Sequence, residues 1–263
     1  MAMLASGQGE TMGKPVQSSS VVAAATAPPR QRAAAGNLVR GRIKTLATEL
    51  FRRFGYNGVT FIDIERELEI RHSLIHYHFG NKPVLAEEVL RDFTEAGIEE
   101  LLEIWGAEDK TLLNKFVMGR DRLYKTLIRY NPDGLIEHAP GLLSRFSLEF
   151  ESITPSMQAY VLEAQRRLQE IVFRAIEIAI ERGELLQTAP KDLLALQIAA
   201  AFFVPGPAAH YGWSFNRVND LLQSIYLTIT RAFGTPISKG APWPPLPKRM
   251  RSSHRRGARG GEI

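Results

Sequence analysis

Hydrophobic positions recur with the period of an α-helix along most of this chain. The first clear stripe has the spacing i, i+3, i+4, i+7, i+8 and i+11, and it consists of Ile43, Leu46, Ala47, Leu50, Phe51 and Phe54. Gly55 follows directly and is a typical helix end. Thr60 then suits the N-cap of a second helix, because Asp63 lies three residues further on in its first turn. The pattern predicts two helices joined by a short turn.

A third helix is predicted from His72 to Phe79, after a turn through residues 69–71. The second and third helices turn apolar side chains inward, namely Phe61, Ile64, Leu68, Ile75 and Phe79. The rest of the third helix is rich in histidine and carries Tyr77. In a helix-turn-helix the last helix presents its outer face to a DNA groove. The spacing therefore indicates a helix-turn-helix.

The remainder of the chain keeps the helical period and shows no strand pattern. Helices are predicted from about Pro83 to Trp105 and at about 110–129, 140–152, 156–182, 191–211 and 216–233. We therefore predict an all-α protein, with an N-terminal three-helix domain at residues 37–82 and a larger helical domain at residues 83–238. Residues 1–36 and 239–263 lack sustained periodicity and are predicted to be disordered tails.

The net charge of +5 is unevenly distributed. Residues 239–263 carry seven cationic side chains and one carboxylate, and residues 38–82 carry eight cations and five anions. The larger helical domain is net acidic, so contact with a polyanion is expected at the helix-turn-helix and the tails. The chain has no cysteine, which excludes disulfides. No apolar run approaches the ~20 residues that span a bilayer, so no membrane association is expected.

The segment Ile43 to Lys82 resembles the DNA-binding domain of the TetR family of bacterial regulators. The resemblance lies in Leu50-Phe51, Gly55-Tyr56, Thr60, Asp63-Ile64, Ile70, Ile75 to Phe79 and Lys82. It implies that Thr60 and Lys82 bind phosphates. It also implies double-stranded DNA as partner, with the major groove or its rim facing Arg71, His72, Ser73, Leu74, His76 and Tyr77. Hydroxyls and lysine suit phosphate oxygens, and apolar groups suit thymine methyls.

Three residues depart from the family pattern. Glu69 stands at the turn where the family favours glycine, and a left-handed glutamate there costs about 1 kcal/mol or more. Arg71 replaces the usual capping serine of the third helix, so Ser73 is an alternative cap that shifts the helix start. Glu65 stands where a small alanine is common. We expect these changes to affect the turn geometry and not the existence of the motif.

The resemblance implies that residues 83–238 bind a small-molecule effector and form a homodimer. Arg120 lies within an apolar stripe, and a buried cation needs a partner. One interpretation is an internal pair with Glu149; the other is that Arg120 binds a ligand carboxylate. The candidate effector-binding residues share apolar helix faces with this pair, and they are Phe116, Tyr124, Phe146, Phe173 and Phe203.

Two C-terminal helices are candidates for the dimer interface. Residues 195–204 are apolar nearly all round, which one partner surface does not explain, and residues 218–233 carry a further apolar stripe. The candidate dimerisation residues are Ile198, Phe202, Leu222, Ile225 and Ile229. An isologous dimer of these helices suits a palindromic operator. Packing within one chain is the alternative for the last stripe.

These features favour a cytoplasmic transcription regulator. The predicted form is a repressor that a small, largely apolar effector releases from DNA; the alternatives are a helical DNA-binding dimer controlled by a protein partner, and an activator. No enzyme, catalytic residue or cofactor is predicted, because the chain has no Gly-rich phosphate loop, nucleophile elbow or HExxH motif. His72 and His76 have metal-ligand spacing, but no third ligand completes a site on that helix, so no metal is predicted.

Overall fold

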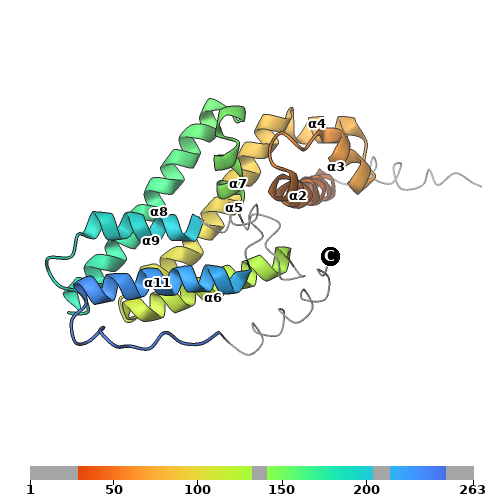
Figure 1. Cartoon of the computed structure of the whole chain (residues 1–263). Helices are drawn as coiled ribbons and strands as arrows, with labels where there is room; N and C mark the ends of the chain where they lie inside the picture. The colour runs from red at the N-terminus through yellow and green to blue at the C-terminus, as the bar shows by residue number, and fades with distance from the viewer. Residues whose placement is uncertain (1–28, 132–140, 204–213, 247–263) are drawn as a thin grey trace, which may run out of the picture. The chain divides into compact units, whose positions relative to one another are not determined.

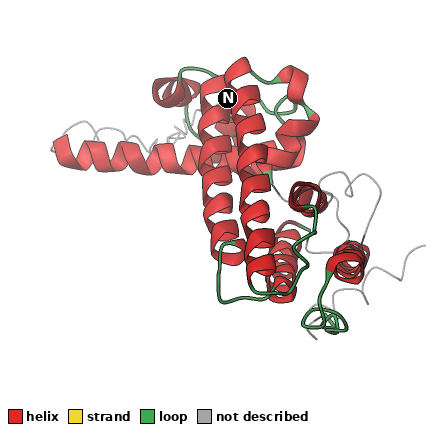
Figure 2. Ribbon diagram, turned by 90° about the vertical axis from the view of Figure 1, so that its left-hand side faces the viewer, coloured by secondary structure: helices red, strands yellow, loops and turns green. Residues whose placement is uncertain are grey.

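The computed structural model describes residues 29–131, 141–203 and 214–246. Every regular element in this described part is a helix, as Figure 2 shows, and an isolated β-bridge joins Leu185 to Gly234. The chain divides into two units, residues 1–42 and 43–263, and helix α2 (Pro29–Phe54) begins in the first unit and ends in the second. Residues 29–36 are therefore helical, and the prediction from composition that they belong to a disordered tail is wrong.

Residues 43–82, which we call the head, hold the end of α2, α3 (Phe61–Leu68) and α4 (His72–Phe79) (Figure 1). The apolar stripes predicted from the sequence form its core: Ile43, Ala47, Phe51, Ile64 and Ile75 are fully buried. Gly55 ends α2 with φ 77°, a conformation that suits glycine. The helix-turn-helix thus folds with the boundaries that its pattern predicts.

Residues 83–246, which we call the body, contain longer helices. These are α5 (Lys82–Trp105), which begins at the last head residue, α6 (Leu112–Tyr130), α7 (Leu142–Leu148), a 3-10 turn (Phe150–Ser152), α8 (Pro155–Glu181), α9 (Lys191–Phe203) and α11 (Phe215–Phe233). Helix α8 packs mainly against α9 and α5, and α6 packs against α11 (Figure 1). Each agrees with a predicted helix, except that the one predicted at 140–152 is a short helix and a separate turn. Residues 204–211 lie outside the described part. No helix of the described part is both long and apolar enough to cross a membrane.

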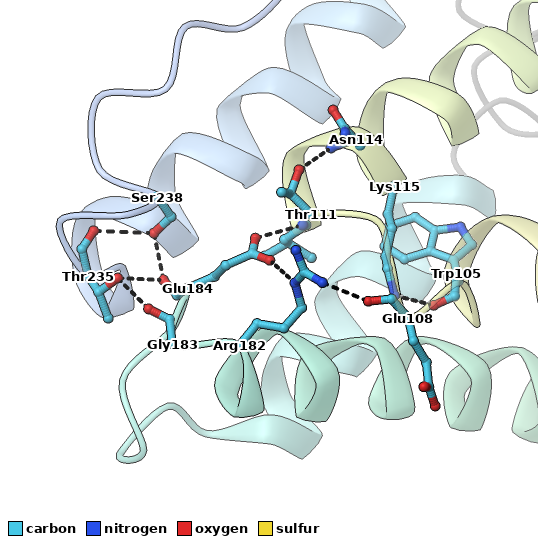
Figure 3. Close-up of polar contacts among 11 residues, drawn as sticks. Trp105, Glu108, Thr111, Asn114, Lys115, Arg182, Gly183, Glu184, Thr235 and Ser238 are labelled. Atoms are coloured by element: carbon cyan, nitrogen blue, oxygen red, sulfur yellow. Dashed lines mark hydrogen bonds and ion pairs between the residues drawn. The ribbon is translucent and has the colours of Figure 1, made fainter.

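A polar cluster joins three helix ends in the body (Figure 3). The buried Glu184 carboxylate accepts hydrogen bonds from the backbone N–H of Leu112, at the start of α6 (2.8 Å), and from Arg182 Nε (3.0 Å). The Glu184 carbonyl accepts from the Ser238 hydroxyl beyond α11 (2.6 Å). Nearby, the buried Lys115 Nζ donates to the Trp105 carbonyl (2.7 Å), and burial lowers the pKa of this lysine. Because buried polar groups are costly without partners, these bonds hold α6, α8 and α11 in register.

Residues 239–246 pack against the body and are not a disordered tail. The Trp243 indole lies 6.3 Å from the Phe116 ring and 5.8 Å from the Tyr226 ring. Its Nε1 donates to Asn219 Oδ1 (3.2 Å), and the next carbonyl, that of Pro244, accepts from Arg120 Nη1 (2.9 Å). Aromatic contacts and two polar bonds therefore hold the first part of the segment that its composition assigns to a tail.

Candidate nucleic-acid interface and internal cavity

Helix α4 packs one face on the head and exposes the other. Ile75 and Phe79 are buried, whereas Tyr77 is 81% exposed. Arg71, Ser73 and His76 are exposed as well, and His72 and Leu74 are half-buried. The residues that the resemblance assigns to DNA therefore share an open surface.

A chain of hydrogen bonds orders the two histidines of this surface. His72 Nδ1 lies 3.1 Å from Glu65 Oε2, the two Nε2 atoms of His72 and His76 lie 3.0 Å apart, and His76 Nδ1 lies 2.6 Å from the Gly80 carbonyl oxygen. The edge of the Phe61 ring supports both imidazoles. Glu65, where the family pattern expects a small residue, thus orients His72 across the helix-turn-helix.

The turn before α4 contains Glu69 and Arg71, two of the residues that depart from the family pattern. Glu69 is left-handed, with φ 54° and ψ 39°, and is the one non-glycine residue of the described part with positive φ. Arg71 occupies the N-cap of α4 without a side-chain hydrogen bond, and the helix begins at His72. The alternative of a shifted start capped by Ser73 is therefore wrong. Packing of Ile75 and Phe79 compensates for the missing cap.

The two candidate phosphate ligands hold the head together. Thr60 and Asp63 form a capping box, with the Thr60 backbone N–H and hydroxyl donating to Asp63 Oδ2 (2.8 and 2.7 Å), and these bonds lower the pKa of Asp63. Lys82 Nζ donates to the carbonyls of Tyr56 (3.1 Å) and Val59 (3.2 Å), and burial lowers its pKa. An ammonium group has three donors, so one hydrogen of Lys82 is left for a phosphate.

A cavity of about 810 Å³ that is partly open to solvent lies in the body. Helices α5 to α9 all contribute to its wall, with apolar side chains such as Leu101, Trp105, Leu123, Ile171 and Val172. Gly97 and Gly119 also border it. A mainly apolar cavity of this size is in the range of small-molecule sites.

The candidate effector-binding residues lie elsewhere. Arg120 is buried and bonds Asp121 Oδ1 (2.9 Å from Nε) and the Pro244 carbonyl, so the prediction of an Arg120–Glu149 pair is wrong. Phe116 packs on Trp105 and Tyr226, Tyr124 on Phe215, and Phe173 lies under Lys191. The Phe203 side chain lies outside the described part. None of the six described candidates lines the cavity, which Trp105, Thr94 and Arg122 border instead.

Phe146 and Glu149 connect the body to the head. The Phe146 ring lies edge-on to Phe51 (5.8 Å) and Tyr56 (6.0 Å). Glu149 Oε2 accepts from the backbone N–H of Asn57 (2.9 Å). Helix α7, which carries Phe146, also contributes Leu143 to the cavity wall. One short helix thus contacts both the cavity and the head.

Arg52 makes a second connection between these regions. This buried head residue places its guanidinium over the ring of Tyr130 (2.9 Å to the centroid) and near that of Phe93 (5.8 Å). Both rings line the cavity. Burial lowers the pKa of Arg52 to about 10, far above neutrality, so it stays cationic. Nothing in the local sequence pattern marks Arg52, which is next to the apolar stripe of α2.

The candidate dimerisation residues face the interior of their own chain. Ile198, Leu222, Ile225 and Ile229 are buried, and Phe202 borders the cavity. The alternative of packing within one chain therefore describes the stripe of α11. A different set is exposed on α9, where Leu193 and Leu196 are 66% and 53% exposed and Ala200 is exposed one turn further.

Comparisons with known proteins agree with this architecture. Residues 43–89 match the family model described as bacterial regulatory proteins, tetR family. A TetR transcriptional regulator from Chloroflexus aurantiacus is 19% identical with a TM-score of 0.63, covering 76% of this chain and 98% of that one. A TetR regulator from Legionella pneumophila is 22% identical with a TM-score of 0.59, covering 72% and 95%. A gamma-butyrolactone receptor (ArpA-like protein) is 14% identical with a TM-score of 0.55, covering 85% and 97%.

At these identities the structural likeness establishes the fold, and the family rests on the head. No curated protein sequence matches the chain. Residues 43–89 form a DNA-binding domain of the type found in bacterial regulatory proteins of the tetR family. This match supports a DNA-binding transcriptional regulator.

Proposed function

We propose that this protein is a ligand-responsive repressor that binds a palindromic operator as a homodimer in the cytoplasm. The effector occupies the cavity of the body and releases the protein from DNA. One observation carries the proposal: α7 lines the cavity through Leu143 and contacts the head through Phe146 and Glu149. A displacement of α7 by a ligand therefore acts directly on the end of α2 and the loop before α3.

The coupling follows from differential binding. A ligand that prefers a body conformation with displaced α7 shifts the population toward heads that fit the operator poorly, typically by ~1–3 kcal/mol. Arg52 adds a second route, because Phe93 and Tyr130 line the cavity and also contact its guanidinium. Both routes end on α2, which packs beneath the helix-turn-helix.

We assign the dimer interface to the outer face of α9. Leu193, Leu196 and Ala200 follow the spacing i, i+3, i+7 and lie on one exposed side, while the opposite side is buried in the chain. A self-complementary apolar face of this kind suits a two-fold axis, and a two-fold dimer suits an operator with two equal half-sites. The DNA-reading residues are those exposed on α4 and at its start, with Thr60 and Lys82 toward phosphates.

Footprinting and gel retardation on genomic fragments of the source organism test the proposal. We expect one palindromic footprint, and loss of at least tenfold in affinity for Tyr77→Ala, because the most exposed aromatic of α4 loses its base contacts. Glu103→Gln, at an exposed site of α5, is the control and should bind normally. Failure to retard any genomic fragment would contradict the proposal. Stimulated transcription from the bound promoter would identify an activator instead.

A further inference from the structure

The cavity contains a buried hydroxyl that makes no hydrogen bond of ordinary geometry in the described part. Thr94, on α5, is 6% exposed and borders the cavity, and its Oγ1 has no hydrogen-bond partner. The adjacent Tyr160 hydroxyl donates to Glu95 Oε1 (2.9 Å), and its oxygen interacts with the Thr94 hydroxyl only outside ordinary hydrogen-bond geometry. A buried hydroxyl without a partner is costly, and such groups often meet a ligand or water.

Other helical threonines of this protein behave differently. Thr48, Thr126 and Thr230 each donate to the carbonyl four residues earlier, at 2.7, 3.1 and 2.9 Å. This back-bonding is the ordinary solution for a threonine inside a helix. Thr126 borders the same cavity as Thr94. The unpaired state is therefore particular to Thr94 and does not come from its position in a helix.

Cationic side chains border the same cavity. Arg122, Lys125 and Arg129 follow the spacing i, i+3, i+7 on α6, so they share one side of that helix. A Cβ atom at Gly97 would lie 3.6 Å from Arg122 Nη2, and Gly97 is one turn from Thr94. The Arg122 guanidinium thus lies beside Gly97, on the part of α5 that carries the Thr94 hydroxyl.

The carboxylates at the cavity already have partners. Glu100 Oε2 accepts from Arg122 Nε (2.5 Å), and Asp121 pairs with Arg120. Lys125 and Arg129 have no ion pair with a described residue. Arg122 has both terminal nitrogens left over, since only its Nε is bonded in the described part. A guanidinium with two such nitrogens matches a carboxylate in a bidentate pair.

We propose that the effector is an amphipathic anion, with an apolar chain or ring system and one carboxylate-like head. The apolar wall formed by Leu101, Trp105, Leu123 and Ile171 holds the apolar part. Arg122 binds the head, Thr94 donates its hydroxyl to the same group, and Lys125 adds positive charge. This inference rests on the proposed function, because it takes the cavity as the effector site.

Three probes of equal chain length test the ligand class: decanoate, decanol and decylamine, each titrated into the full-length protein by calorimetry and thermal shift. We expect decanoate to bind about tenfold more tightly than decanol, the effect of one charge-assisted hydrogen bond or ion pair, and decylamine to bind most weakly. Equal binding of decanoate and decanol, or no binding of decanoate, would overturn the inference.

Variants identify the residues that bind the head. Arg122→Met and Thr94→Val should each weaken decanoate binding about tenfold while leaving decanol binding unchanged. Thr126→Val borders the same cavity but loses only a back-bonded hydroxyl, so it should bind decanoate normally. Arg166→Met, on the outer side of α8, controls for loss of positive charge. Thr94→Val should also raise the melting temperature of the ligand-free protein, which shows that the variant folds.

The readout separates the two proposals. Decanoate binding that depends on Arg122 and Thr94 supports the ligand class even if operator retardation is unaffected, and in that case only the effector role fails. If a ligand releases the operator equally well from the wild type, Arg122→Met and Thr94→Val, the proposed function stands and the anionic ligand class is overturned.

Discussion

The head and the body hold their polar groups by contacts of very different sequence separation. In the head, Thr60 bonds Asp63 three residues away, and His72 bonds Glu65 seven residues away. In the body, Glu184 bonds Leu112 at a separation of 72 residues, and Arg120 bonds Pro244 at 124. The printed polar contacts within the head span up to 26 residues, from Lys82 to Tyr56, whereas those of the body reach 124.

This difference gives the two regions different tasks. Short-range contacts let the head keep its shape when it is displaced, as a DNA-reading unit must. In the proposed mechanism, the long-range contacts of the body carry a change at the cavity to distant helices. Phe146, Glu149 and Arg52 are among the described side chains through which the two regions meet.

The largest expected effect comes from removing the body residue that fills the core of the head. Phe146→Ala should destabilise the protein by about 3–5 kcal/mol in urea unfolding, because a fully buried ring between Phe51 and Tyr56 is lost. Leu148→Ala, on the same helix but 48% exposed, should cost less than about 1 kcal/mol.

Hydrogen exchange sharpens this test. Amides of residues 47–57 should lose protection in Phe146→Ala more than amides of α11, which packs mainly on α6 and α9. Equal loss in both places would show that head and body unfold as one unit and would remove the distinction between them.

Arg120→Met tests the long-range contacts of the body. The change leaves the Pro244 carbonyl without its donor and Asp121 without its partner, so a loss of about 1–3 kcal/mol in unfolding free energy is expected. Arg166→Met, an exposed ion-paired arginine, should change stability by less than about 1 kcal/mol. An unchanged unfolding free energy in Arg120→Met would mean that the contact with Pro244 does not stabilise the body.

Glu69→Gly tests the local strain of the head. Relief of a left-handed glutamate should stabilise the protein by about 1 kcal/mol. Glu67→Gly, inside α3 two residues earlier, should destabilise it by about 1 kcal/mol, because glycine is unfavourable within a helix. Chemical unfolding measures the change in unfolding free energy for both variants. Changes of the same sign would contradict a left-handed Glu69.

Acid should weaken both regions by the same physical cause. Hydrogen bonds from Thr60 lower the pKa of Asp63 below 3.8, and bonds from Ser156 and Arg91 lower the pKa of Glu87 below 4.5. Between the lowered folded-state values and the unfolded ones, the unfolded chain binds more protons, so stability falls as pH decreases through this window. Urea midpoints measured from pH 7 to 3 should fall less steeply for Asp63→Asn and Glu87→Gln; unchanged slopes would contradict this origin.

The sequence predicts the head well because its signals are local. The apolar stripe of α2, the cap at Thr60 and the limits of α4 all depend on residues within a few positions of one another. Even the departure at Glu69 takes the backbone conformation that a glycine position implies. The DNA contacts themselves stay predictions.

The body is predicted only as a series of helices, because a periodic pattern does not say which neighbour each face meets. Helix α6 has apolar residues on two sides: Phe116 and Tyr124 meet α11 or its neighbours, while Leu123 and Gly119 meet the cavity. The partner of Arg120 lies 124 residues away in a segment rich in proline, which no helical period reveals. Phe146 lies on an apolar face of α7, but the residues it contacts, Phe51 and Tyr56, belong to the head, and the local pattern does not identify them.

The packing of Trp243 against the body limits how many residues can be removed from the C-terminal side. A version ending at Ser238 would bare the aromatic edges of Phe116 and Tyr226 and deprive a buried guanidinium of its acceptor. Stable shortened forms for crystallisation should therefore retain everything through Leu246, and a fused tag belongs beyond that residue.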